Sequence, residues 1–297
     1  MKRDLLTLSD LNASELQSLL QRALFFKKNQ TCEPILKNKV LGVIFEKSST
    51  RTRVSFEVAM YRLGGKAVVL EGQTIQISRG ETYADTAKVL SRYVNALVLR
   101  TYSQENLEDL AKNASVPVIN GLTDLYHPCQ ILADLMTILE QKKNLDNLTI
   151  SYIGDGNNMT NTWIEAALML PFHLVVSCPP GYGLSKNILN SIKGKTNIEI
   201  FTDPIKGVTN SDVVNTDTWF SMGQKVSVAK KKAFKKFQIN KKLLSYAKRD
   251  ALVLHCLPAH RGEEITDEVI DGKQSAVFDE AENRLYVQMA LLEFLMR

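Results

Sequence analysis

Residues 40–63 read VLGVIFEKSSTRTRVSFEVAMYRL, and this stretch decides the fold class. An apolar run of strand length, 40–45, is followed by a polar turn and then by a segment with helical spacing, 52–63. Two parallel strands cannot be joined by a tight turn, so a helix usually crosses over the sheet between them. The stretch therefore predicts the first strand and the first crossover helix of a parallel α/β fold.

The same alternation of strand and helix continues along the chain. Most of the later apolar runs are separated by segments with helical spacing, and the runs lie at 67–70, 96–99, 116–119, 148–153, 174–178, 198–201, 212–215 and 251–254. Strands that read as continuous apolar runs are typical of parallel sheets covered by helices on both faces. A polar segment at 141–147 separates the runs into two groups, so we expect two domains with one small sheet each.

Composition limits the class of protein. The chain has 297 residues, 44% of them hydrophobic, which is enough for two buried cores. No apolar run approaches the roughly 20 residues that span a bilayer, and residues 1–10 lack the apolar core of a signal peptide. The four cysteines are scattered, so we expect reduced thiols. These features predict a soluble cytoplasmic protein with no membrane partner.

One segment, 230–242, is rich in lysine, although the net charge of the whole chain is a modest +5. A nucleic-acid patch is one interpretation of such a run. A solvated helix face with a few buried apolar anchors, among them Phe234, Phe237 and Leu243, is the interpretation we favour. We therefore expect no nucleic-acid partner.

The turn after the first strand has the features of a phosphate site. Ser49, Thr50, Arg51, Thr52 and Arg53 lie where the strand ends and the helix begins. Backbone amides and the helix dipole favour an anion there, and an arginine offers a planar fork of donors for phosphate oxygens. The alternative is a plain N-cap followed by solvent-exposed arginines.

Three further residues could meet the same anion. Ligands of open parallel sheets bind beyond the carboxyl ends of the strands, and Arg100 directly follows the run 96–99. His127 and Gln130 enter the next helical pattern, where a neutral imidazole could donate to a carbonyl oxygen. The alternative for His127 is a capping or core histidine.

The second half of the chain carries a different set of polar strand ends. Gly154–Asp–Gly–Asn–Asn158 resembles a dinucleotide loop, but the third glycine of that fingerprint is missing, so a loop that offers amides to a substrate is favoured. Asp217 follows the run 212–215 and would suit a cationic substrate. Cys256 follows the last run as a nucleophile, a substrate ligand or a buried thiol, the last being favoured by sequence alone.

Taken together, these motifs resemble the aspartate and ornithine carbamoyltransferase family over essentially the whole chain. The SxRTR turn at 49–53, the later Arg100 and the HPxQ motif at 127–130 match the family as a whole. The GDGNN loop at 154–158, DxWxSMG at 217–223 and HCLP at 255–258 match its ornithine branch.

The resemblance implies an α/β fold of two domains, each a mainly parallel sheet flanked by helices. Residues 1–135 would bind carbamoyl phosphate, joined by a C-terminal helix at 281–297 that returns to them, and residues 136–280 would bind ornithine. The implied carbamoyl phosphate site comprises Ser49, Thr50, Arg51, Thr52, Gln76, Arg100, His127, Gln130, Cys256, Leu257 and Arg284. The implied ornithine site comprises Asn158, Asp217, Ser221 and Met222. The implied catalytic residues are Arg51, Arg100, His127 and Cys256, and Arg53 is interpreted as structural.

The implied reaction transfers the carbamoyl group of carbamoyl phosphate to the side-chain amine of L-ornithine, giving L-citrulline and phosphate, as in arginine biosynthesis. It requires no metal and no organic cofactor. The resemblance also implies a homotrimer or a multiple of trimers, in which Gln76 reaches across a subunit interface. The rivals are carbamoyl transfer to acetylornithine, putrescine or aspartate, a nicotinamide dehydrogenase, and a basic nucleic-acid-binding module. The sequence leaves open whether the reaction serves synthesis of arginine or breakdown of citrulline.

Overall fold

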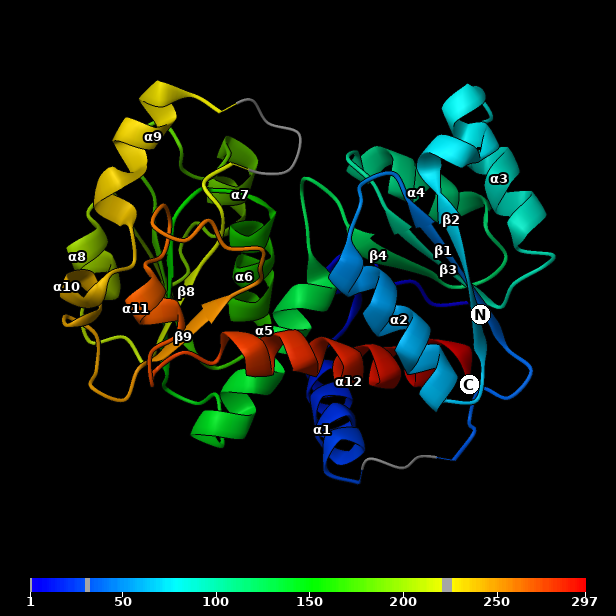
Figure 1. Ribbon diagram of the computed structural model, residues 1–297, viewed down its shortest axis with the longest axis horizontal. Helices are drawn as coiled ribbons and strands as arrows, with labels where there is room; N and C mark the ends of the chain where they lie inside the picture. Colours follow the sequence, from blue (N-terminus) through cyan, green and yellow to red (C-terminus); the bar gives the residue numbers. More distant parts are fainter. Residues whose placement is uncertain (1, 30–32, 221–225) are drawn as a thin grey trace. The chain divides into compact units, whose positions relative to one another are not determined.

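The computed structural model describes residues 2–29, 33–220 and 226–297. They form two compact units, Met1–Met136 with Glu282–Arg297, and Thr137–Ala281 (Figure 1). Each unit contains its own sheet, and the strand pairs of both sheets are parallel. The predicted α/β fold with two parallel sheets is therefore confirmed.

The sheet of the first unit has the strand order β2-β1-β3-β4. Its strands are β1 (Val40–Phe45), β2 (Lys66–Glu71), β3 (Ala96–Arg100) and β4 (Val118–Leu122). The inner strands β1 and β3 and the edge strand β4 are almost wholly buried, whereas β2 alternates between exposed and partly buried residues. Continuous apolar sequence does not by itself mark a strand covered on both faces, because the run 67–70 of β2 is also apolar and yet Val68 is 48% exposed.

Helices cover both faces of this sheet. Those of the first half of the chain are η1 (Leu8–Asp10), α1 (Ala13–Asn29), α2 (Thr50–Arg62), η2 (Gly72–Thr74), η3 (Gln76–Arg79), α3 (Tyr83–Leu90), α4 (Gln104–Asn113) and α5 (Pro128–Lys142). Ala87 of α3 and Leu107 and Leu110 of α4 lie in one buried cluster with Leu97 and Leu99 of β3. Hydroxyl N-caps begin several helices, as Thr82 does for α3.

The last helix, α12 (Val277–Met296), returns to the first unit from Glu282 onward. Its Glu293 accepts a hydrogen bond from the guanidinium of Arg22 on α1 at 2.6 Å. Its Asn283 accepts from the ammonium of Lys27 at 2.8 Å. The predicted return of the C-terminal helix is confirmed.

The sheet of the second unit has the strand order β7-β6-β5-β8-β9. Its strands are β5 (Thr149–Ile153), β6 (His173–Ser177), β7 (Ile198–Phe201), β8 (Val213–Thr216) and β9 (Leu252–His255). Its helices are α6 (Asn158–Met169), α7 (Lys186–Ser191), α8 (Pro204–Val208), α9 (Val228–Phe234), η4 (Lys235–Phe237), α10 (Lys241–Leu244) and α11 (Asp267–Ile270). One buried cluster joins β5, β8 and β9 to α8, η4, α10 and α11.

The lysine-rich segment differs from the prediction in one respect. It forms α9, η4 and α10, and its apolar anchors Phe234, Phe237 and Leu243 are buried as expected. Lys230, however, is only 9% exposed, so the prediction of a solvated face is wrong at this position. Its spacing explains the difference, because Lys230 lies one helical turn before Phe234 and shares the buried side of α9.

Two further sequence predictions concern membranes and thiols. Among the residues that the structure describes, no helix combines the length and apolar character needed to cross a bilayer. Cys129, Cys178 and Cys256 are free thiols, and Cys32 lies outside the described residues.

In both sheets the order of the strands reverses beside the first strand of the unit. The chain runs from β1 outward to β2 and then places β3 on the other side of β1. It runs from β5 through β6 to β7 and then places β8 on the other side of β5. The connections therefore diverge between β1 and β3 and between β5 and β8, where ligands of open α/β sheets bind.

Candidate active site

The reversal point of the first sheet brings together the predicted phosphate-site residues. Phe45 at the end of β1 is in register with Arg100 at the end of β3. Four residues after Phe45, Ser49 caps α2 by accepting from the amide of Thr52 at 3.2 Å. The start of α2 thus lies beside the end of β3, as the strand order requires.

The hydroxyl of Thr52 is the point on which this cluster converges. Thr52 is 1% exposed, and its Oγ1 accepts from Ser49 Oγ at 3.0 Å. It also accepts from Arg100 Nη1 at 3.4 Å and from Arg284 Nη2 at 2.8 Å. Two buried guanidinium groups therefore meet at the first turn of a helix, where the helix dipole adds to their positive potential.

Arg284 is held by a second set of buried groups. Its Nη1 donates to Oε1 of Gln130, and Nε2 of Gln130 donates to Asp134 Oδ1 at 2.8 Å. Arg284, Gln130 and Asp134 are all buried. Because Gln130 is one turn into α5 and Arg284 comes from α12, this chain of hydrogen bonds joins distant parts of the sequence around Thr52.

His127 lies at the start of α5 and is buried. Burial lowers its pKa well below 6.5, and the positive charges of Arg284, Arg100 and Lys47 lower it further. The imidazole is therefore neutral at physiological pH, so one ring nitrogen carries a proton that can be donated to an oxygen without adding a charge.

This pKa predicts a stability effect at mildly acidic pH. The unfolded chain binds a proton at His127 below about pH 6.5, whereas the folded chain does not, so the stability contribution is complete above that pH and is lost as the pH falls. Between pH 7.5 and 5.5 the free energy of unfolding should fall by about 1.4 kcal/mol more in the wild type than in His127→Gln. Urea unfolding of both proteins at the two pH values measures the difference. An equal loss in both would contradict a depressed pKa.

The sequence interpretation missed two residues of the same turn. Lys47 is 4% exposed, forms an ion pair with Asp124, and lies 4.2 Å from the ring centroid of Tyr102. Glu46 accepts from the hydroxyl of Tyr83 at 2.6 Å, and burial with this contact raises the pKa of Tyr83 to about 12. Both residues follow β1 in the sequence, but a charged residue in a polar turn gives no indication that Lys47 is buried or that Glu46 is half-buried.

The two flanking arginines of the turn differ in their partners. Arg53 is exposed and donates to Glu71 at 2.8 Å and to Glu57 at 3.4 Å. Arg51 is half-buried, and within residues 2–29, 33–220 and 226–297 its guanidinium makes no ion pair with a carboxylate. Arg51 is therefore available to an anion, while Arg53 is engaged on the surface of the unit. Thr50 is exposed at the first position of α2.

Gln76 is not joined to this cluster. It is the exposed first residue of η3, and its backbone carbonyl accepts from the amide of Glu81 at 3.1 Å. The structure thus brings together Ser49, Thr52, Arg100, His127, Gln130 and Arg284, and leaves Gln76 in a surface turn after β2.

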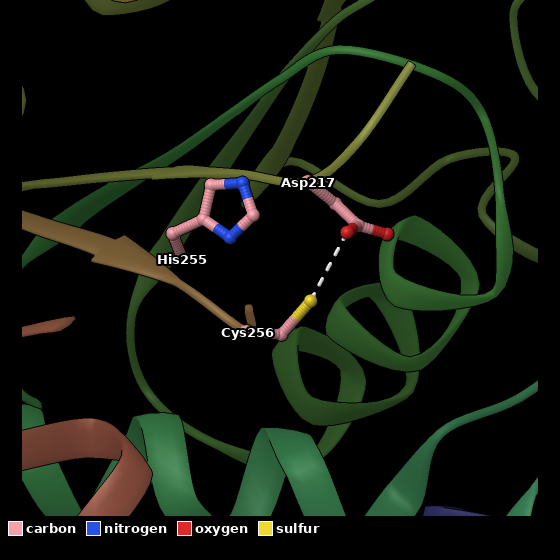
Figure 2. A group of neighbouring side chains, drawn as sticks. All are labelled: Asp217, His255 and Cys256. Carbon is pink, nitrogen blue, oxygen red and sulfur yellow. Dashed lines mark hydrogen bonds between the residues drawn. The ribbon is translucent and has the colours of Figure 1, made fainter. Parts of the chain in front are cut away.

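The reversal point of the second sheet carries a carboxylate, which meets a thiol from the next strand. Asp217 follows β8 and Cys256 follows β9, whose neighbouring residues Thr216 and His255 are in register. Figure 2 shows the thiol of Cys256 directed at Asp217, and Sγ donates to Oδ1 at 3.0 Å. The nucleophilic form of cysteine is the thiolate, whereas Cys256 acts here as a hydrogen-bond donor, so this contact favours a positioning role for Cys256 over a nucleophilic one.

Asn157 is the second partner of Asp217, and the sequence interpretation gave it no role. Its Nδ2 donates to Asp217 Oδ2 at 2.9 Å, while its Oδ1 accepts from the amide of Met159 at 3.0 Å and caps α6. Its position directly before a helical pattern was the available indication, since asparagine is a preferred N-cap. Asn158, the predicted ligand, is the first residue of α6.

Gly156 of the 154–158 loop allows close packing. A Cβ on Gly156 would lie 2.5 Å from the carbonyl carbon of Gly183, so only glycine fits without a backbone shift. The amide of Gly156 donates to the carbonyl of Tyr182 at 2.9 Å. The loop is therefore fastened to its neighbouring loop within the second unit.

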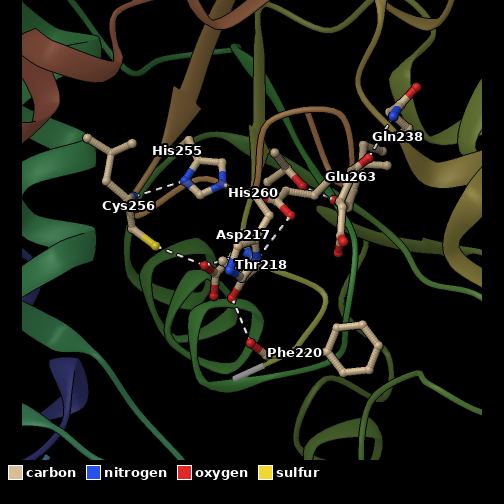
Figure 3. A network of polar contacts seen from close by, with 12 residues as sticks. Asp217, Thr218, Phe220, Gln238, His255, Cys256, His260 and Glu263 are labelled. Atoms are coloured by element: carbon tan, nitrogen blue, oxygen red, sulfur yellow. Dashed lines mark hydrogen bonds and ion pairs between the residues drawn. The ribbon is translucent and has the colours of Figure 1, made fainter. Parts of the chain in front are cut away.

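His255 organises the end of β9. Its Nδ1 accepts from the amide of Leu257 at 2.9 Å, so Nε2 carries the proton and donates to Glu264 at 3.2 Å (Figure 3). Leu257 has a φ of 55°, in the left-handed region that non-glycine residues rarely adopt. The amide of His255 donates to Glu280 at 2.8 Å, so the strand end is held on several sides.

The ligand atoms of Asp217, His255 and Cys256 lie within 4.8 Å of one another, a spacing that could suit a metal. Both nitrogens of His255 already bond to protein groups, and the thiol bonds to the carboxylate. A metal would have to break these hydrogen bonds. Ser221 and Met222, the other predicted ornithine ligands, lie outside the described residues.

Comparison with known proteins gives a consistent result for both halves of the chain. Residues 3–140 match the carbamoyl phosphate-binding domain of the aspartate/ornithine carbamoyltransferases, and residues 146–295 match their aspartate/ornithine-binding domain. An ornithine carbamoyltransferase of Syntrophus aciditrophicus is 52% identical over 301 residues, covering 99% of this chain and 100% of that protein.

Solved structures are also similar over the full length. The ornithine carbamoyltransferase of Pyrococcus furiosus has a TM-score of 0.94 at 47% identity, with 99% of this chain and 97% of that chain covered. That of Thermus thermophilus has a TM-score of 0.93 at 38% identity, with both chains covered completely at 100%. The chain therefore belongs to the aspartate/ornithine carbamoyltransferase family.

Proposed function

We propose that this protein is an ornithine carbamoyltransferase, which transfers the carbamoyl group of carbamoyl phosphate to the side-chain amine of L-ornithine. The observation that carries the proposal is the convergence of Arg100 and Arg284 on the hydroxyl of Thr52 at the start of α2. A buried pair of guanidinium groups at a helix start suits the phosphate group of an acyl phosphate. The relatives named above are all ornithine carbamoyltransferases.

Carbamoyl phosphate is assigned to residues 1–135 with the helix at 281–297. Its phosphate accepts from the backbone amides and hydroxyls at Ser49 and Thr50 and from the guanidinium of Arg51. Each charge-assisted hydrogen bond of this kind contributes about 1.5–3 kcal/mol. The other proposed contacts to this substrate are those of Gln76, Gln130, Cys256, Leu257 and Arg284.

The carbamoyl oxygen is assigned to three donors. Thr52, Arg100 and neutral His127 donate to this oxygen as it gains negative charge during attack. A donor aimed at such an oxygen is often worth about 3 kcal/mol of transition-state stabilisation. Because the pKa of His127 is lowered, the imidazole donates its proton in a hydrogen bond but does not hold an extra one.

The chemical steps balance without a metal or an organic cofactor. The neutral amine nitrogen of ornithine attacks the carbamoyl carbon and forms a C–N bond; the C–O bond to phosphate then breaks. Phosphate takes the electron pair and accepts the proton that the amine loses. The free amine has a pKa near 10.4, so the positive charges of Arg51 and Arg100 assist by favouring its neutral form.

Ornithine is assigned to residues 136–280. Asp217 provides the negative charge that a cationic amino acid requires, and Asn158, Ser221 and Met222 are its proposed neighbours. Cys256 donates a hydrogen bond to Asp217 and contributes by position. Aspartate as acceptor would call for cationic residues in place of Asp217.

The acceptor assignment is tested with four amines. Purified protein is incubated with carbamoyl phosphate and, separately, with ornithine, acetylornithine, putrescine and aspartate, and the carbamoylated products are quantified. We expect kcat/KM for ornithine to exceed that for each alternative by at least about 100-fold, because a site that hydrogen-bonds the polar groups of its substrate discriminates against analogues that leave those bonds unmade. A higher value for any other acceptor would replace ornithine in the assignment.

The family also supports proposals on assembly and setting. We infer a homotrimer or a multiple of trimers, in which Gln76 extends the phosphate site of a neighbouring subunit, and its exposure on η3 is compatible with that role. The native mass in solution tests the assembly. The proposed setting is arginine biosynthesis in the cytoplasm.

A further inference from the structure

Lys230 of the lysine-rich segment occupies an unusual environment. Its Nζ lies 2.6 Å from Oδ2 of Asp155, and the two side chains are 11% and 13% exposed. A buried ion pair is costly to break, because removal of one partner leaves the other charge without compensation. The neighbouring Lys231 pairs with Glu263 instead, and its side chain is 42% exposed.

Aromatic rings enclose the ammonium of Lys230. Its Nζ is 5.5 Å from the ring centroid of Tyr182, 5.4 Å from that of Phe220 and 5.3 Å from that of Phe234. The rings also pack on one another, with Tyr182 and Phe234 centroids 5.1 Å apart. Ring faces attract cations, and this attraction strengthens when water is excluded. The environment therefore fixes the position of the ammonium.

Asp155 connects this ammonium to the acceptor residues. Its backbone carbonyl accepts from Thr160 Oγ1 and from the amide of Asn157, both at 2.8 Å. Asn157 in turn donates to Asp217 at 2.9 Å. Because Gly156 is packed against Gly183, the loop between Asp155 and Asn157 has little room to adjust independently.

The charges around Asp155 also connect Lys230 to the acceptor residues. Burial raises the pKa of Asp155, Lys230 acts to lower it, and the charge of Asp217 raises it. Lys230 thus neutralises the charge of Asp155, so that the negative charge of the neighbouring Asp217 can interact with a cationic substrate.

We infer that the ion pair between Lys230 and Asp155 is a positioning device for the acceptor: it holds the 155–157 loop, and through Asn157 the carboxylate of Asp217, in the arrangement that receives cationic ornithine. This inference rests on the proposed function. Lys230 itself is a positioning residue and touches no reacting atom.

The test compares Lys230→Met with Lys231→Met, which removes the same charge from the same helix. In Lys230→Met the KM for ornithine should rise by about tenfold or more, while the KM for carbamoyl phosphate stays within about twofold of wild type. Lys231→Met should leave both constants within about twofold, and Lys230→Arg should recover most of the lost ornithine affinity. A folded Lys230→Met with unchanged KM for ornithine, or equal losses for both substrates, would overturn the inference.

A double variant covers the case in which Lys230→Met does not fold. Lys230→Met with Asp155→Asn removes both charges, so no buried carboxylate is left without a partner. We expect this double variant to fold and to raise the KM for ornithine by about tenfold or more, while the KM for carbamoyl phosphate stays within about twofold of wild type. An unchanged KM for ornithine in the folded double variant would contradict positioning through the ion pair. If wild-type protein forms citrulline and the variants behave otherwise than expected, only this inference fails; if wild type forms none, the proposed function itself fails.

Discussion

Replacing Arg51 with glutamine should lower kcat/KM for carbamoyl phosphate by about 100- to 1,000-fold. Arg51 lies in the first turn of α2 beside Thr52, and its guanidinium makes no ion pair with a carboxylate in the described parts of the chain. The positive charge is therefore free to stabilise the phosphate as it leaves, an electrostatic effect whose loss typically costs about 3–4 kcal/mol. Steady-state kinetics with saturating ornithine measure the effect.

Arg53→Gln is the matched control for this experiment. It makes the same substitution two residues along the same helix, at an exposed arginine already paired with Glu71 and Glu57. Exposed pairs of this kind contribute about 0–1 kcal/mol to stability, so Arg53→Gln should stay within about threefold of wild type. Near-normal turnover in a folded Arg51→Gln protein would remove Arg51 from the site.

Asp217→Asn should raise the KM for ornithine by roughly 10- to 100-fold. Asparagine keeps the shape of the side chain and still accepts from Cys256 or Asn157, but it loses the negative charge that attracts the cationic substrate. A charge-assisted hydrogen bond is worth about 1.5–3 kcal/mol, which corresponds to this range. The KM for carbamoyl phosphate should change little, because this substrate is assigned to the first unit.

The control for Asp217 is Asp250→Asn, which neutralises a carboxylate in the same unit. Asp250 is on the surface, where it accepts from Lys142 at 2.7 Å. Its replacement should leave both KM values unchanged within about twofold. If ornithine affinity is the same in Asp217→Asn as in wild type, Asp217 does not bind the acceptor.

The strands and their order of appearance could be predicted because burial leaves a direct record in composition. Each of the nine apolar runs overlaps a strand of the structure, and the segment predicted as helical at 52–63 is α2 at Thr50–Arg62. The local structure of the turn at 49–52 was also predictable, because N-caps and helix starts are local features. Ser49 caps α2 by a contact with a residue only three positions away.

Residues that act through distant contacts could not be predicted from local patterns. Arg284 reaches Thr52 across 232 positions, and only the family resemblance pointed to it. The lysine-rich composition of 230–242 predicts a solvated face for Lys230 as for its lysine neighbours. Its spacing to Phe234, however, places it on the buried side of α9. Charge alone does not distinguish a buried partner of Asp155 from a solvated surface lysine.

The return of α12 to the first unit has a consequence for biosynthesis of the protein. During translation the N-terminal part of a chain emerges and folds first, at roughly 5–20 residues per second. The turn at Ser49–Thr52 therefore leaves the ribosome well before Arg284, its partner 232 positions later. The hydrogen bond between Thr52 and this guanidinium can form only after the whole second unit has been synthesised. A nascent chain that has not yet reached α12 would carry the turn at 49–52 but lack one of the two guanidinium groups that converge on Thr52, so the complete cluster forms only after α12 has been synthesised.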